Sequence, residues 1–289
     1  MDLKGHTGQA RLGVLAYRPA PVQVAYLGYP GTSAAPFIDY VIADRVVIRP
    51  QDEPFYSEKI AYLPHSYQVN DDRAAIPAAP PRDELGLPPD AFVFSCFNAP
   101  YKLRAGLFNV WMRLLAQVPG SVLWLFDPGA AGTRNLRAAA RERGVAPERL
   151  VFAPRTEHGR HLARQQRADL FLDTLPYNAH TTASDALWAG LPVLTCVGST
   201  FAGRVAASLL GALGLPELAT RTLAQYEALA LRLARDPGAL AAVRSKLARQ
   251  RAAAPLFDSA RFCRDIERAY LHMWHRHQRG EAPASFELR

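Results

Sequence analysis

The stretch from Pro176 to Val193, PYNAHTTASDALWAGLPV, places a histidine and two threonines between an apolar run and a helical pattern. The preceding run, ADLFLDT, has the composition of a buried strand, and a helix is predicted to begin at Thr181. The first turn of a helix has free backbone amides and a partial positive charge of about half a unit. His180, Thr181 and Thr182 therefore stand where a phosphate group would bind.

Other polar residues follow neighbouring apolar runs. Lys102 comes after the run AFVFSCFN, and Asp185 lies one turn into the helix predicted from Thr181. The helix predicted after the run RLVFAP carries His161 and Arg164. In an open parallel sheet, ligands bind outside the carboxyl ends of the strands. An ammonium and a helix N-terminus that converge on one crevice fit a diphosphate better than a single anion.

Each of these residues also has a purely structural explanation. A threonine before a helix is an ordinary N-cap, and Asp185 could only complement the helix dipole. Most exposed lysines do nothing specific, so Lys102 alone would mean little. His180 alone could pack in the core, and Arg164 could be a solvated charge. Their joint placement at the carboxyl ends of strands favours a binding site.

Several common catalytic motifs are absent from the sequence. No G-x-G-x-x-G follows the first strand, which argues against a dinucleotide oxidoreductase, and no G-x-x-x-x-G-K-[ST] indicates a P-loop. No G-x-S-x-G indicates an α/β hydrolase. His272, His275 and His277 spread around a terminal helix with no carboxylate beside them, which favours solvent over metal. No metal site and no cofactor is predicted.

From about residue 90 onward, apolar runs alternate with helical patterns. Strands are predicted within 91–98, 121–126, 149–154, 168–174 and 192–197. Strands that are apolar throughout and separated by helices are typical of a parallel sheet covered on both faces. Residues 91–258 are therefore predicted to form a doubly wound, Rossmann-like α/β lobe with right-handed crossovers.

The flanking segments have a different character. Residues 1–68 contain two strand-like pieces, VQVAYLG and DYVIADRVV, and are interpreted as the remainder of another α/β unit. Residues 69–90 are rich in Pro and Asp and are predicted to be a linker. Residues 259–289 are predicted to form an amphipathic helix and a tail. Strands near residues 20–48 are expected to lack neighbours, which would leave an exposed sheet edge.

Composition limits the class of protein. Of the 289 residues, 49% are hydrophobic and 21% charged, and no apolar run reaches the roughly 18 residues that span a bilayer. With no signal-peptide segment, a cytoplasmic location and no membrane partner are predicted. The net charge of +8 comes from arginines scattered over Ala-rich helices without an aromatic-basic cluster, so no nucleic-acid partner is predicted. Three cysteines without paired spacing indicate no disulfide framework.

Six motifs together resemble the O-GlcNAc transferase (SPINDLY-like) family of glycosyltransferases. They are LGYPGTSAAPFIDYVIAD, YSEKIAYLPHSY, FNAPYKL, VPGSVLWLF, DLFLDTLPYNAHTTASDALWAGLPVLT and RVAASLL, and they run in order along the chain. The resemblance implies a GT-B arrangement of two facing Rossmann-like lobes. The C-terminal lobe would be complete and would bind the nucleotide sugar, while the N-terminal lobe would be partial. The resemblance also implies an inverting enzyme that needs no metal.

The resemblance assigns roles to residues by position. Lys102 would stabilise the departing diphosphate, and His180, Thr181 and Thr182 would form the turn at the diphosphate and sugar. Asp185 would hold the ribose. Contacts to the uridine and to the sugar would come from His161, Arg164, Leu27, Gly28 and Pro30. Lys102 and His180 are the predicted catalytic residues. Ala99 stands where many members have an amide side chain.

The implied function is transfer of GlcNAc from UDP-GlcNAc to Ser or Thr hydroxyls of proteins. Two alternatives stay open: an N-glucosyltransferase or O-fucosyltransferase relative, and a non-catalytic nucleotide-binding fragment. Members of this family normally carry TPR repeats and the first part of the N-terminal lobe before this region. Both would be missing here, so turnover by this chain alone is not assumed.

Overall fold

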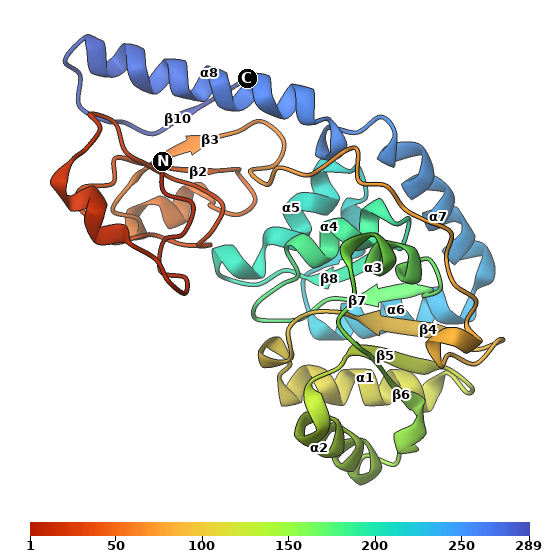
Figure 1. Cartoon of the computed structure of the whole chain (residues 1–289). Helices are drawn as coiled ribbons and strands as arrows, with labels where there is room; N and C mark the ends of the chain where they lie inside the picture. Colours follow the sequence, from red (N-terminus) through yellow and green to blue (C-terminus); the bar gives the residue numbers. More distant parts are fainter.

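The computed structural model describes residues 1–289 and contains two parallel sheets (Figure 1). The first has the order β1-β2-β3-β10, formed by Val24–Ala25, Tyr40–Ala43, Lys59–Tyr62 and Phe286–Glu287. The second has the order β6-β5-β4-β7-β8-β9. Its strands, from β4 to β9, are Val93–Cys96, Val122–Phe126, Leu150–Ala153, Leu170–Leu172, Val193–Cys196 and Ala219–Thr220.

Eight α-helices accompany these strands. In chain order, α1 to α8 are Ala105–Gln117, Gly129–Glu142, His158–Gln165, Thr181–Trp188, Val205–Ala212, Leu223–Arg235, Pro237–Arg251 and Ser259–Gln278. The strands β4, β7 and β8 are buried along their whole length, so their apolar side chains require cover on both faces. Helix α1 packs beside α6, and α4 packs with α3, α5 and α7. The predicted doubly wound lobe is confirmed. No helix is both long and apolar enough to cross a bilayer.

The order of the second sheet reverses at its centre. From β4 the chain moves outward to β5 and β6, then returns to β7 on the other side of β4 and continues to β8 and β9. Such a reversal opens a crevice at the carboxyl ends of the two central strands. Strand β4 leads toward Lys102 and β7 leads toward Thr181, so the topology brings these two segments together.

The first sheet is small and is completed from the far end of the chain. Strand β10 pairs in parallel with β3, with Phe286 opposite Ala61 and Glu287 opposite Tyr62. Asp2 forms an isolated bridge to Ala25 on the outer side of β1. Helix α8 lies alongside this sheet (Figure 1). The sequence predicts that these strands lack neighbours, but less of the sheet edge is open than predicted. The tail pairs with β3 through β10, and Asp2 pairs with part of β1.

Two buried polar contacts join the lobes. The Arg204 side chain, at the start of α5, donates to Asp52 Oδ2 at 2.6 Å and to the Val47 carbonyl at 2.9 Å. Ser208 Oγ donates to Asp44 Oδ2 at 2.6 Å. Because Arg204 is only 3% exposed, its buried charge depends on this counter-ion from the first lobe.

The segment 69–90 contains no α-helix or strand and lies along the second lobe. Trp188 Nε1 donates to the Ala74 carbonyl at 2.9 Å, and Arg167 Nε donates to the Pro80 carbonyl at 2.6 Å. These contacts hold the segment against α4 and the end of α3.

Candidate functional site

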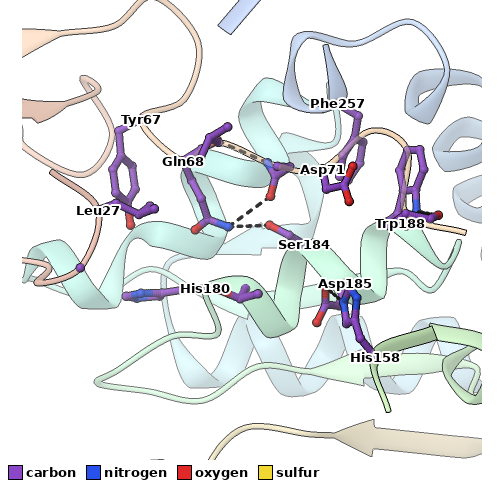
Figure 2. Close-up of a pocket in the computed structure, with 15 residues that line it drawn as sticks. Leu27, Tyr67, Gln68, Asp71, His158, His180, Ser184, Asp185, Trp188 and Phe257 are labelled. Carbon is purple, nitrogen blue, oxygen red and sulfur yellow. Dashed lines mark hydrogen bonds and ion pairs between the residues drawn. The ribbon is translucent and has the colours of Figure 1, made fainter. Parts of the chain in front are cut away.

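A cavity of about 410 Å³ lies between the two lobes, along helix α4 (Figure 2). Its walls come from the loop after β1, from the segment that follows β3, and from the starts of α3 and α4. The lining residues are Leu27, Gly28, Tyr67, Gln68, Val69, Asn70, Asp71, Ala74, His158, His180, Thr181, Ser184, Asp185, Trp188 and Phe257. Several of the residues predicted from the sequence therefore meet in one place.

Helix α4 begins at the inner end of this cavity with two free amides. The amides of Ala183 and Ser184 donate to the His180 carbonyl at 3.0 and 3.1 Å. Those of Thr181 and Thr182, at the first two helical positions, have no carbonyl within the helix to bond. The helix start thus offers unpaired N–H groups and the positive end of its dipole.

The loop that leads into α4 is fixed by a buried carboxylate at the end of β7. Asp173 accepts hydrogen bonds from the amides of Thr174 and Ala179 at 2.7 and 2.6 Å, and from Thr195 Oγ1 at 2.6 Å. Burial raises the pKa of Asp173 to about 6, and the hydrogen bonds oppose this rise. The carboxylate therefore sets the position of the helix start relative to the sheet.

Lys102 comes from the turn after β4 and reaches this same loop. Its Nζ donates to the Asn178 carbonyl at 2.8 Å and lies 4.1 Å from the centre of the Tyr177 ring. Burial lowers the pKa of Lys102 to about 8, and Asp173 opposes that shift. The ammonium is therefore mostly charged at pH 7. Lys102 itself does not line the cavity but borders the loop that forms its inner end.

His180 lies at the same end and is neutral. Its ring stacks on Tyr177 with centroids 5.0 Å apart, and its Nε2 is 3.3 Å from the Ala202 carbonyl. Burial, followed by the charge of Lys102, lowers the pKa of His180 to about 4. Because a carbonyl can only accept, Nε2 carries the proton and Nδ1 is left as an acceptor.

The two threonines have different surroundings. Thr181 lines the cavity, whereas Thr182 Oγ1 donates to Asn98 Oδ1 at 2.5 Å. Asn98 in turn donates to Thr174 Oγ1 at 2.7 Å. The Thr182 hydroxyl thus joins the ends of β4 and β7, and Thr182 itself does not line the cavity.

One turn along α4, Asp185 contacts a histidine side chain that the sequence did not indicate. Its Oδ1 is 3.1 Å from His158 Nε2, and both side chains line the cavity (Figure 2). Burial raises the pKa of Asp185, while His158 opposes the rise. His158 is the first residue of α3, three positions before His161. The sequence alone does not show which of the two histidines faces α4, because this depends on how the helix is rotated about its axis.

His161 and Arg164 lie outside this cavity. Arg164 donates to His161 Nδ1 and, at 2.7 Å, to the Pro154 carbonyl. Both pack on Phe97: the His161 ring is 5.1 Å from it edge-on, and the guanidinium is 4.7 Å above it. Burial lowers the pKa of His161 to about 4. Arg164 instead borders a separate cavity of about 550 Å³ beneath residues 77–85.

The first lobe contributes Leu27 and Gly28, while Pro30 does not line the cavity. Leu27 has a φ of 65°, and a Cβ on Gly28 would lie 1.9 Å from the Leu3 carbonyl oxygen. Glu58 anchors the rest of this loop by accepting from the Ser33 amide and from Thr32 Oγ1, both at 2.6 Å. Elsewhere, no three His, Cys, Asp or Glu side chains come together in a way that could hold a metal ion.

A doubly wound lobe with an anion-accepting helix start at its switch point, facing a second parallel sheet, defines a GT-B-type glycosyltransferase fold. The chain belongs to glycosyl transferase family 41, whose sequence profile matches residues 1–80 and 78–266. The family membership predicted from the six motifs is thereby confirmed.

The similar proteins agree with this assignment. The chain is 40% identical over 295 residues to the probable UDP-N-acetylglucosamine--peptide N-acetylglucosaminyltransferase SEC of Arabidopsis thaliana, across 100% of this chain and 30% of that protein. A mutant of the O-GlcNAc transferase of Thermobaculum terrenum superimposes with a TM-score of 0.87 at 36% identity, across 94% of this chain and 52% of that one. A sucrose-phosphate synthase of Thermosynechococcus elongatus, 17% identical with a TM-score of 0.57, shares the fold alone over 82% of this chain and 59% of its own.

Proposed function

We propose that this chain is the donor-binding part of a glycosyltransferase that moves a sugar, GlcNAc by preference, from a UDP-sugar to Ser or Thr hydroxyls of proteins. The observation that carries the proposal is the start of α4 at the switch point of the sheet, with its free amides, together with the Lys102 ammonium bonded to the loop that leads into this helix. The names of the relatives, which include peptide N-acetylglucosaminyltransferases, support the donor and the acceptor class.

The chemistry suits a diphosphate leaving group. A hydroxyl oxygen attacks the anomeric carbon as the bond from that carbon to the diphosphate breaks. The electron pair leaves with the diphosphate, and the hydroxyl proton passes to water. Preorganised donors aimed at the developing charge lower the barrier for such a step. Lys102 supplies a point charge and the Thr181 and Thr182 amides supply dipoles, so the proposed displacement requires no metal. Attack from the face opposite the leaving group inverts the anomeric carbon.

The two ends of the cavity suit the two ends of the donor. With the diphosphate at the helix start, the ribose would lie one turn along α4, where Asp185 can accept from its hydroxyls. We assign the contact with the uridine end to His158, which is 3.1 Å from Asp185. His161 and Arg164 would then act at a distance by fixing the position of α3. The sugar would lie toward Leu27, Gly28 and His180.

Calorimetric titration with UDP, UMP and GDP tests this assignment. We expect UDP to bind more tightly than UMP or GDP. Lys102→Met should weaken UDP binding by about 2 kcal/mol, because a charge-assisted contact is lost, and should weaken UMP binding less. Lys59→Met, which removes an exposed lysine on β3, is the matched control and should change neither affinity. Equal effects of the two substitutions would contradict the role of Lys102.

Two other functions have specific support. Because the chain spans only 30% of the length of the Arabidopsis relative, it could be a fragment that binds the nucleotide without turnover. UDP binding without transfer or hydrolysis, even after the rest of the catalytic region is supplied, would favour that function. Tighter binding of GDP than of UDP would favour an O-fucosyltransferase relative.

A further inference from the structure

Gln68 lies opposite the start of α4 on the segment that leaves the first lobe. Its side chain is only 5% exposed, yet it lines the cavity. Figure 2 shows its amide pointing toward Ser184 on α4. Because Gln68 lines the cavity, its side-chain amide can contact a ligand bound there directly.

A chain of hydrogen bonds fixes which way the amide of Gln68 faces. Asn70 Nδ2 donates to the carbonyls of Leu256 and Gln68 at 3.1 and 3.3 Å, so Asn70 presents its Oδ1 to the Gln68 side chain. Gln68 must therefore present its Nε2, which donates to Asn70 Oδ1 at 3.3 Å and to Ser184 Oγ at 2.7 Å. Both amide hydrogens are used, and Oε1 is left without a protein donor.

This oxygen cannot bind the diphosphate, because phosphate oxygens are acceptors as well. The groups at the inner end of the cavity that suit phosphate are donors, namely the amides at the start of α4 and the nearby Lys102 ammonium. Gln68 Oε1 is an acceptor placed among them. Further acceptors among the residues that line the cavity are the hydroxyl oxygens of Thr181 and Ser184 and Nδ1 of the neutral His180. Several acceptors in one cavity suit a ligand with several O–H or N–H groups.

We propose that Gln68 Oε1 accepts a hydrogen bond from an O–H or N–H of the sugar, and so selects the sugar without contributing to recognition of the nucleotide. This inference rests on the proposed function, because it needs the diphosphate at the start of α4. Gln68 is then a specificity-determining residue supplied by the segment that joins the lobes.

The test compares a nucleotide with its sugar derivative in one variant. Gln68→Met keeps the length of the side chain but removes the acceptor. By calorimetry on the full chain, we expect UDP to bind within about twofold of its original affinity and UDP-GlcNAc to bind about tenfold more weakly, the loss of one neutral hydrogen bond. An equal change in both affinities, or no change in either, would overturn the proposal.

Two further measurements sharpen the result. UDP-2-deoxyglucose keeps the other hydroxyls of the sugar and has no donor at C2, so a loss that persists with it assigns the contact to one of those hydroxyls, and a loss that disappears assigns it to the acetamido N–H. Gln68→Glu keeps an acceptor and should preserve the ratio of the UDP-GlcNAc and UDP affinities, even where its charge weakens both.

If the unaltered chain does not bind UDP, the proposed function itself is wrong, and this result is distinct from a failure of Gln68 alone.

Discussion

The two lobes are built in different ways. The second lobe has six strands from a continuous stretch of chain, and several are completely buried. The first has four short strands, two of only two residues each, and residues 1–90 form no α-helix. Its 3₁₀ turns Leu12–Tyr17 and Pro50–Phe55 bury no side chain, and Tyr17 and Phe55 are 90% and 77% exposed. The second lobe supports itself, whereas the first depends on contacts from the rest of the chain.

The difference matters because the lobes contribute to different ends of the cavity. Groups suited to the diphosphate, Lys102 and the start of α4, belong to the self-supporting lobe. Groups suited to the sugar, Leu27, Gly28 and Gln68, belong to the first lobe or to the segment leaving it. Damage to the first lobe should therefore affect recognition of the sugar more than binding of UDP.

The largest effect is expected from the buried contact between the lobes. Asp52→Asn leaves the Arg204 guanidinium without its counter-ion and should lower the free energy of unfolding by about 3 kcal/mol. Thermal unfolding measures the loss, and limited proteolysis should cut the first lobe before the second. Glu217→Gln, which breaks an exposed pair with Lys246, is the control and should cost less than about 1 kcal/mol. Equal stability of the two variants would contradict a dependent first lobe.

A smaller effect is expected at the loop beside the sugar end. Gly28→Ala forces a Cβ against the Leu3 carbonyl and should cost about 2 kcal/mol of stability. The displaced loop should weaken binding of UDP-GlcNAc and leave binding of UDP unchanged. Gly13→Ala, where a Cβ would meet nothing within 4 Å, is the matched control. If UDP affinity falls as far as UDP-GlcNAc affinity, the assignment of the two cavity ends to different lobes is wrong.

The smallest effect is a pH dependence confined to the second lobe. Lys102 has its pKa lowered to about 8, and only its charged form attracts a diphosphate. UDP affinity should therefore be nearly complete at pH 7 and below and should fall as the pH rises through about 8, by about tenfold between pH 7 and pH 9. Titrations with UDP across this range measure how the affinity depends on pH. This pH dependence should be absent in Lys102→Met. If it remains in that variant, a group other than Lys102 causes it.

Much of the second lobe could be predicted from the sequence. Five of its six strands are short apolar runs between helices, so their type follows from a repeated pattern, and the helix at Thr181 begins as predicted. The two-residue strand β9, Ala219–Thr220, was not predicted. Strand β10 could not be predicted in this way. Two residues carry no periodicity, and their partner strand is formed by a distant part of the chain.

The residues of the site are likewise predictable only where a local pattern places them. Lys102 and Thr181 follow strand ends, and the fold explains why such positions converge. His158 and Gln68 give no such signal. The position of His158 depends on the exact phase of α3, and that of Gln68 on hydrogen bonds to Asn70 and Ser184 from separate segments. The Thr182 hydroxyl, predicted at the diphosphate, donates to Asn98, a bond that the sequence did not indicate and that links the ends of the two central strands.

The pairing of β10 with β3 constrains the order of events during synthesis. Ser285, whose hydroxyl accepts from the Ile60 amide beside this strand, is made 225 residues after Ile60. A ribosome extends the chain by about 5–20 residues per second, so many seconds pass between the synthesis of β3 and that of β10. During this time the edge of β3 has no partner strand, although the second lobe can already fold. During that interval the open edge of β3 can bind a chaperone or pair with a strand of another nascent chain.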